Sequence, residues 1–204
     1  MLGQRLGWFI IGMVLARLVA PEDFGLFALM MVFNMLAIIF VDSGFYSALI
    51  LKQDITYTDE CSVFWFNMAA GTMVALIMVA ASPWIASLFG HEVLMPLTWL
   101  MAANLWIQAW TSVPSALLSK QLNFKLQMQA GLIATFSAGV LSIYLAWIGW
   151  GVWALAIQFF ATTTIRSVLL WTLYHWRPAR RFSLARMREM FSFGSYIFFS
   201  GLLG

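Results

Sequence analysis

The chain has 204 residues, of which 63% are hydrophobic and only 9% are charged. A water-exposed surface needs far more charge than this, so the composition excludes a soluble globular protein, and a net charge of +3 gives no reason to expect a nucleic-acid partner. The lone Cys61 excludes a disulfide framework within the chain and a cysteine-based zinc site. We therefore expect a membrane protein that uses no metal ion and no cofactor.

Apolar segments long enough to cross a bilayer follow one another from the first residues onward. A helix needs about 20 mostly apolar residues to cross the hydrocarbon core. By that measure the sequence predicts complete spans at residues 2–20, 25–51, 61–81, 94–118, 127–148 and 150–174. Residues 191–204 are apolar again but too few to cross alone, so we expect the chain to be a piece of a longer protein.

These segments predict the organisation of the chain. We expect residues 1–174 to form a lobe of six transmembrane helices, residues 175–190 a basic cytoplasmic linker, and residues 191–204 the truncated start of a seventh helix. The fold class is an all-α, polytopic membrane helix bundle. The loops are too short to hold a soluble catalytic domain, so the function must lie within the membrane, and we do not expect an enzyme.

The first turn between spans contains residues with distinct backbone roles. Pro21 should end the first helix, and the carboxylates of Glu22 and Asp23 favour the positively polarised start of the next one. Gly25 is expected to allow a tight reversal of the chain. Arg17 lies one turn earlier, where it could pair with Glu22 or Asp23.

Lysine and arginine gather in alternate loops. Nine of the eleven basic residues fall on one side of the predicted membrane: Arg5, Lys52, Lys120, Lys125, Arg177, Arg180, Arg181, Arg186 and Arg188. Because basic loops stay on the cytoplasmic side, we expect a cytoplasmic N-terminus. The turns at residues 21–24, 90–92 and 149 then lie on the outer side. Tryptophans near the predicted span ends, such as Trp84 and Trp150, are typical of anchors at the membrane interface.

Polar side chains inside the spans are informative, because each costs free energy in hydrocarbon unless it faces protein or water. Three spans each carry such residues on one helix face: Asn104, Gln108, Thr111 and Ser115 on the fourth, Gln158, Thr162 and Arg166 on the sixth, and Asn34 and Asp42 on the second. This pattern predicts a hydrated cavity shared by three helices. The alternative is interhelical hydrogen bonding in a dry bundle, which we favour for Thr111, Ser115 and Thr162.

Arg166 and Asp42 are the residues that carry charge inside these stripes. An ionised side chain within a span is a candidate functional residue by default. Both lie at a similar predicted depth, so a mutual ion pair is the structural alternative to a binding role.

Small residues recur every four positions on the fifth span, at Gly131, Thr135 and Gly139. Such a stripe lets a neighbouring helix approach closely. We therefore predict a tight helix–helix contact along this face.

Several short runs of sequence resemble one known family. They are residues 15–25 (LARLVAPEDFG), 40–45 (FVDSGF), 47–50 (SALI), 113–118 (VPSALL), 122–125 (LNFK) and 149–155 (GWGVWAL). In this order and spacing they resemble bacterial polysaccharide exporters, the O-antigen and colanic-acid type flippases of the multidrug/oligosaccharidyl-lipid/polysaccharide exporter superfamily. The resemblance covers the whole chain.

The resemblance implies a transporter of two pseudo-symmetric six-helix lobes, with a central cavity that opens alternately to either side. This chain would be the N-terminal lobe. The cargo would be an undecaprenyl-diphosphate-linked oligosaccharide that crosses the bacterial inner membrane, and the partners would be membrane lipids, the second lobe and a polysaccharide polymerase. The resemblance implies a basic residue against the anionic headgroup, for which Arg166 is the candidate. The polar stripes add Gln158, Asn104 and Gln108 as residues around it, and Asp42 and Arg17 are possible ion-pair or coupling residues.

Other functions stay open at this point. A multidrug/cation antiporter or a lipid II type flippase belongs to the same superfamily, and Asp42 is the one carboxylate suited to ion coupling. A membrane-bound polysaccharide polymerase or ligase ranks behind these, because such enzymes need long outer loops that carry catalytic side chains. A purely structural subunit would not need polar faces on three spans.

Overall fold

The computed structural model describes residues 2–42, 45–52, 54–184, 187–188 and 191, with only the backbone described for residues 2–6, 8 and 42. The predicted start of a seventh span falls almost wholly on residues 192–204, which lie outside the described residues. The side chains of Arg5 and Asp42 also lie outside them.

Six long helices and one short helix make up the described chain: α1 (Leu2–Leu18), α2 (Pro21–Asp42), α3 (Phe45–Leu51), α4 (Tyr57–Phe89), α5 (Leu94–Lys120), α6 (Phe124–Trp147) and α7 (Val152–Leu173). This confirms the all-α bundle. Among the described residues, α2, α4, α6 and α7 are long and apolar enough to cross a membrane, and α1 contributes a shorter apolar stretch, Phe9–Leu18. Helix α5 is the most enclosed of the described helices.

The predicted second span was wrong at both ends. The helix begins at Pro21 rather than near Gly25, ends at Asp42, and is followed by the separate helix α3. Proline has no N–H to lose at the first position of a helix, which explains this start. Gly25 therefore lies inside α2, with no atom within 4 Å of a Cβ built on it, so the predicted role in a chain reversal was also wrong.

Local sequence explains where α4 begins and ends. The Thr56 side chain accepts a hydrogen bond from the Asp59 N–H, and the Asp59 carboxylate accepts one from the Thr56 N–H, which is a capping box. Gly90 ends the helix with φ of +70°, a conformation that glycine adopts without steric cost. The 33 residues between these caps make α4 about 50 Å long at 1.5 Å per residue.

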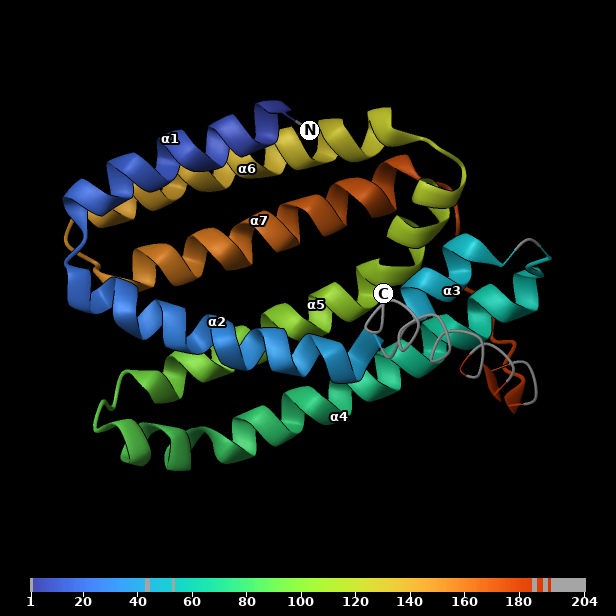
Figure 1. Cartoon of the computed structure of the whole chain (residues 1–204), viewed down its shortest axis with the longest axis horizontal. Helices are drawn as coiled ribbons and strands as arrows, with labels where there is room; N and C mark the ends of the chain where they lie inside the picture. Colours follow the sequence, from blue (N-terminus) through green and yellow to red (C-terminus); the bar gives the residue numbers. More distant parts are fainter. Residues whose placement is uncertain (1, 43–44, 53, 185–186, 189–190, 192–204) are drawn as a thin grey trace, which may run out of the picture.

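The long helices lie roughly side by side, and their connections gather at two ends (Figure 1). The α1–α2, α4–α5 and α6–α7 turns share one end. The α2–α3–α4 connection, the α5–α6 turn and the segment after α7 share the other. The second end carries the basic residues Lys52, Lys120, Lys125 and Arg177, and the Lys120 ammonium donates a 2.5 Å hydrogen bond to the Lys52 carbonyl. We call this the basic end; the side of the membrane on which it lies stays a prediction.

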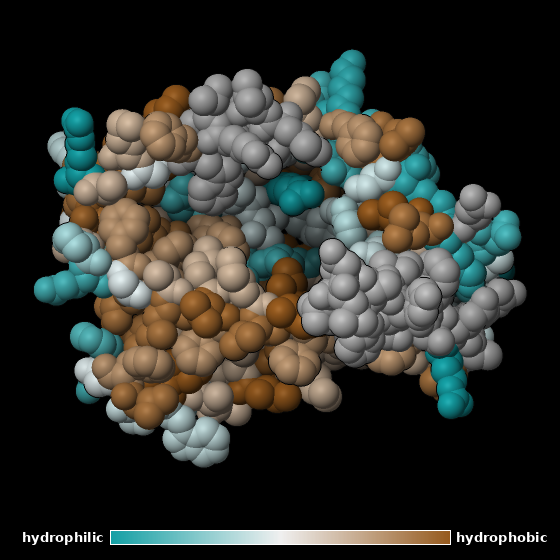
Figure 2. Space-filling model, viewed as in Figure 1, coloured by the Kyte–Doolittle hydropathy of each residue, from teal (hydrophilic) through white to brown (hydrophobic). Residues whose placement is uncertain are grey.

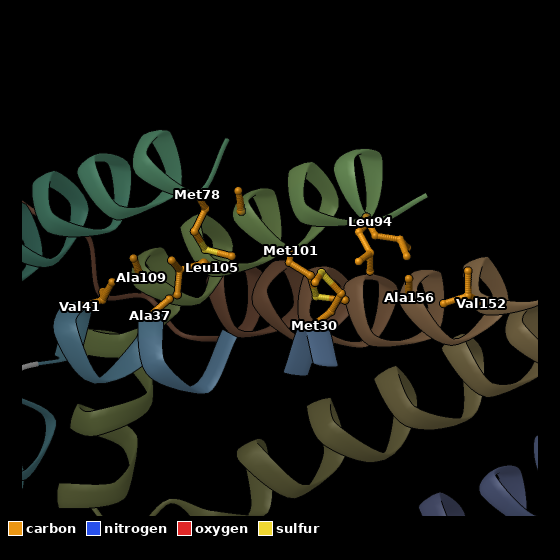
Figure 3. Packing of buried hydrophobic residues seen from close by; sticks show 12 residues of the cluster. Met30, Ala37, Val41, Met78, Leu94, Met101, Leu105, Ala109, Val152 and Ala156 are labelled. Atoms are coloured by element: carbon orange, nitrogen blue, oxygen red, sulfur yellow. The ribbon is translucent and has the colours of Figure 1, made fainter. Parts of the chain in front are cut away.

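Helix α5 runs through the middle of the bundle and packs against α2, α3, α4 and α7. The main hydrophobic cluster joins α5 to three of these helices: Met30, Ala37 and Val41 from α2, Met78 from α4, Leu94, Met101 and Leu105 from α5, and Val152 and Ala156 from α7 (Figure 3). At 1% exposure or less, Leu94, Met101 and Leu105 are fully enclosed by protein. A polar face on such a helix therefore points into the protein rather than to lipid.

The predicted close approach on the fifth span is confirmed, and its partner is α1. A Cβ built on Gly139 would stand 2.2 Å from Ile11 Cδ1, and one built on Gly7 would lie 3.6 Å from the Thr135 Cγ2. Because Gly139 has no side chain, the Ile11 side chain can lie directly against the α6 backbone at this position. The α1–α6 pair forms one edge of the bundle (Figure 1).

Candidate functional site

The polar face of α5 is present and is mostly buried. Asn104 is fully buried, Thr111 and Ser115 are buried, and Gln108 is half-buried. The Thr111 hydroxyl lies 2.6 Å from the Ser167 hydroxyl of α7 and also donates to the Ile107 carbonyl. For Thr111 the geometry is that of interhelical hydrogen bonding, as we favoured from the sequence.

Asn104 differs from the other residues of this face. Among the described residues, neither its amide nitrogen nor its amide oxygen has a hydrogen-bond partner. A buried polar group without a partner costs about 1–3 kcal/mol. A side chain retained at such a cost in the centre of the bundle is a strong candidate for a functional role.

A second buried amide faces α5 from α2. Asn34 is 4% exposed, and its amide oxygen also has no partner among the described residues. The contact of Thr98 with Met30, an offset of 68 residues, sets the register of the two helices. By that register Asn34 lies within one turn of Asn104, on the α2 stripe that also carries Met30 and Val41. Asn34 was predicted on the polar face of the second span but was not among the predicted site residues.

Helix α7 carries its polar stripe from the interior to the surface. Gln158 is 5% exposed, Thr162 is half-buried and donates to the Gln158 backbone carbonyl at 2.7 Å, and Arg166 is exposed. The polar stripe therefore runs from a buried part of α7 at Gln158 to an exposed part of its surface at Arg166. A guanidinium on that face is accessible to a ligand.

Figure 2 shows a hollow between α7 and α2 in which hydrophilic side chains gather, with hydrophobic surface along one side of it. The two helices touch near their first turns, where the ring centroids of Phe27 and Phe159 are 6.4 Å apart, and they diverge toward the basic end (Figure 1). The hollow is a consequence of this divergence.

Asp42 and Arg17 are on other helices than this stripe and lie at opposite ends of the bundle. Asp42 ends α2 at the basic end, past the point where α2 and α7 diverge, and its side chain lies outside the described residues. Its predicted pairing with Arg166 stays a prediction. Arg17 is exposed in the last turn of α1, beside the α1–α2 turn at the opposite end.

The buried amides and the exposed Arg166 suit different groups of a ligand. Each amide of Asn34, Asn104 and Gln158 offers both donors and an acceptor, which suits hydroxyl-rich ligands. Arg166 offers a planar, permanently charged fork that matches two oxygens of a phosphate. Among the described residues, no group of three His, Cys, Asp or Glu side chains is placed to hold a metal ion.

Buried asparagines such as Asn34 and Asn67 were harder to interpret from sequence. Asn67 of α4 is also fully buried; its amide nitrogen donates to the Ser112 hydroxyl at 3.3 Å, while its amide oxygen, like that of Asn34, has no partner among the described residues. Only the three-dimensional neighbours show which groups of a buried amide are bonded. The shared helix face of Asn34, Met30 and Val41, spaced by four and seven residues, was the available signal.

Comparison with known proteins places these features in a family. Residues 14–204 match the family described as polysaccharide biosynthesis protein. The chain is 31% identical to the succinoglycan biosynthesis transport protein ExoT of Rhizobium meliloti, over 91% of this chain and 38% of that protein. It is 28% identical to the teichuronic acid biosynthesis protein TuaB of Bacillus subtilis, over 78% of this chain and 33% of that protein.

A third relative is the lipopolysaccharide biosynthesis protein WzxC of Escherichia coli, 25% identical over 90% of this chain and 38% of that protein. The chain thus spans between 33% and 38% of the length of these three curated relatives. No solved structure matches the chain.

Proposed function

The chain belongs to the polysaccharide biosynthesis protein family, and on that premise we propose that it moves a lipid-linked oligosaccharide across the bacterial inner membrane during polysaccharide biosynthesis. The observation that carries this proposal is the polar hollow between α2 and α7 in an otherwise apolar bundle, together with an exposed arginine on α7, Arg166. A glycan needs hydroxyl-binding groups inside the membrane, and its diphosphate needs a cation.

Within this proposal Arg166 contacts the diphosphate, and the amides of Asn104, Gln108 and Gln158 contact sugar hydroxyls. Arg166 suits its part because a guanidinium can bind two phosphate oxygens at once. The buried amides suit theirs because sugar hydroxyls would supply the hydrogen bonds that Asn104 lacks within the described chain. Asn34, at the same level as Asn104, joins this set.

We also propose the orientation and the partners. The basic end faces the cytoplasm, because loops rich in Lys and Arg stay on that side, and the N-terminus is therefore cytoplasmic. The described helices act as one lobe that works with a second lobe around a shared cavity. A polysaccharide polymerase would consume the translocated oligosaccharide on the outer side. The proposed chemistry is transport, with no covalent step, so the protein is not an enzyme.

A deletion experiment tests this function. The gene that encodes the chain is deleted, and lipid-linked oligosaccharide is extracted and quantified by mass spectrometry, together with surface polysaccharide. The proposal predicts that the lipid-linked intermediate accumulates while surface polysaccharide falls, and that the intact gene restores both. Normal surface polysaccharide with no accumulated intermediate would overturn it.

A further inference from the structure

The segment that follows α7 is held against the first turns of α4, and we call residues 174–184 the strap. Two side chains of α4 bind its backbone directly: the Tyr57 hydroxyl donates to the Arg177 carbonyl at 2.6 Å, and the Trp65 indole N–H donates to the Ala179 carbonyl at 2.9 Å. Bonds of this kind fix the path of an irregular chain. The strap therefore has a defined shape.

Further contacts fasten the strap along its length. The Ser183 N–H donates to the Ser62 hydroxyl at 3.0 Å, the Ala179 N–H donates to the Cys61 sulfur at 3.3 Å, and the Trp176 indole donates to the Glu60 carboxylate at 2.7 Å. The Trp176 ring also packs on Phe64 and Trp171. Every α4 residue named here comes from the first three turns of the helix.

The spacing of two exposed tryptophans indicates that the first turns of α4 lie at the level of the lipid headgroups. The exposed tryptophans Trp65 and Trp84 are 19 residues apart, or about 28 Å along the helix, close to the roughly 30 Å thickness of the hydrocarbon core. Tryptophan favours the two membrane interfaces. Residues 57–64 then extend beyond the hydrocarbon at the basic end. The strap, which is bound to them, lies at the same depth.

The outer side of the strap combines cations with apolar side chains. Arg180 and Arg181 are exposed, and Phe182 and Leu184 next to them are 51% and 68% exposed. Arg177 is fixed by the strap itself, with its guanidinium donating to the Tyr174 and Trp176 carbonyls and lying 5.3 Å from the centroid of the Trp171 ring. Arg180 and Arg181 are thus the two arginines presented outward.

We propose that the strap is a docking surface for anionic phospholipid headgroups of the surrounding bilayer. Arg180 and Arg181 bind lipid phosphates, and Phe182 and Leu184 enter the boundary between headgroups and acyl chains. A basic and apolar surface at headgroup depth lies next to the lipids of the bilayer. This position favours phospholipid over an acidic peptide as the ligand. Because the hydrogen bonds to α4 already order the strap, little conformational entropy is lost on binding.

Native mass spectrometry of the purified full chain tests this proposal. The protein is titrated with phosphatidylglycerol or phosphatidylcholine of equal chain length, and bound lipids are counted. The wild type should retain phosphatidylglycerol preferentially. Arg180→Gln/Arg181→Gln should weaken that retention by roughly tenfold or more, because each basic residue near an anionic surface contributes to the attraction, and should leave phosphatidylcholine retention unchanged.

Two further variants separate a formed site from general charge. Arg17→Gln/Lys125→Gln removes two exposed cations away from the strap, and it should keep most of the phosphatidylglycerol preference. Tyr57→Phe/Trp65→Phe keeps every charge but removes two strap bonds, and it should lose part of the preference. Equal loss in the strap and off-strap charge variants, or no loss in either, would overturn the proposal, provided that all variants elute as monodisperse protein.

Discussion

Ile11 of α1 packs directly onto Gly139 of α6, so closely that a Cβ at position 139 would stand 2.2 Å from Ile11 Cδ1. This contact ties the N-terminal helix to the bundle, because α1 packs chiefly on α6. The hydrophobic cluster around Ile11, Leu15 and Leu155 then extends the contact to α7. The position of α1 along one side of the bundle thus depends on the lack of a side chain at residue 139.

Gly139→Ala is therefore expected to destabilise the protein. Adding a methyl group to a full contact forces side chains or backbone to shift, at about 1–3 kcal/mol. Thermal unfolding in detergent, followed by fluorescence or by loss of monodisperse protein, measures the change.

Gly12→Ala is the matched control, because Gly12 lies on the same helix pair but has no atom within 4 Å of a built Cβ. It should be neutral or slightly stabilising, since alanine favours the helix. Equal stability of the two variants would contradict the close contact.

Buried amides give a prediction in which stability and function move in opposite directions. Asn104→Leu removes a polar group that has no partner among the described residues, so stability should stay equal or rise. Export of polysaccharide by the complete gene product should fall, because the amide is proposed to bind sugar hydroxyls. Unfolding temperature and surface polysaccharide are measured on the same preparations.

Asn67→Leu is the control for this pair of measurements. Its amide donates to Ser112, away from the hollow, so the variant should lose stability while export per inserted molecule stays normal. If Asn104→Leu gains stability and exports normally, Asn104 does not belong to the site.

The helices could be predicted from the sequence more reliably than the site. Long apolar runs predicted the six long helices, because a chain that crosses hydrocarbon must satisfy its backbone hydrogen bonds within a helix. The division of the second span into α2 and α3 was missed, since both sides of the break are apolar. Nothing in residues 45–51 alone separates a short helix beside α5 from the end of a longer span.

The strap shows a second limit of the sequence. Its basic residues were recognised, but its fastening to α4 joins residues more than 110 positions apart. Trp171 and Trp176 near the span end were expected as interfacial anchors, yet they pack against Phe64 in an aromatic cluster. Burial also raises the pKa of the neighbouring Tyr174 phenol, which stays protonated at physiological pH while it accepts a hydrogen bond from Gln121.

The orientation can be tested by chemical labelling. Leu184 and Glu92 are exposed near the two opposite ends, so single cysteines at these positions report on the two sides of the membrane. In a Cys61→Ser background, an impermeant thiol reagent added to intact cells should label Glu92→Cys and not Leu184→Cys. The opposite pattern would reverse the proposed topology, and labelling of both after cell lysis is the control.

The relation between Asp42 and Arg166 can be tested with a double variant. If the two form a structural ion pair, Asp42→Asn and Arg166→Gln should each lower the folded yield, because one uncompensated charge remains, and the double variant should restore it. If Arg166 serves the cargo in a hydrated hollow, each single variant should keep near-normal yield and the double variant should not restore export. Recovery of both yield and export by the double variant would remove Arg166 from the proposed site.

The most direct test of the proposed function is the export rate of Arg166 variants in the complete gene product, normalised to the amount of inserted protein. Arg166→Ala should lower export by at least about tenfold, because a charge-assisted hydrogen bond to phosphate contributes roughly 1.5–3 kcal/mol. Arg166→Lys should keep part of the activity, since it retains the charge but loses the planar fork. The exposed Lys125→Ala should export normally. Normal export by Arg166→Ala would contradict the central claim that this arginine binds the anionic headgroup of the transported lipid.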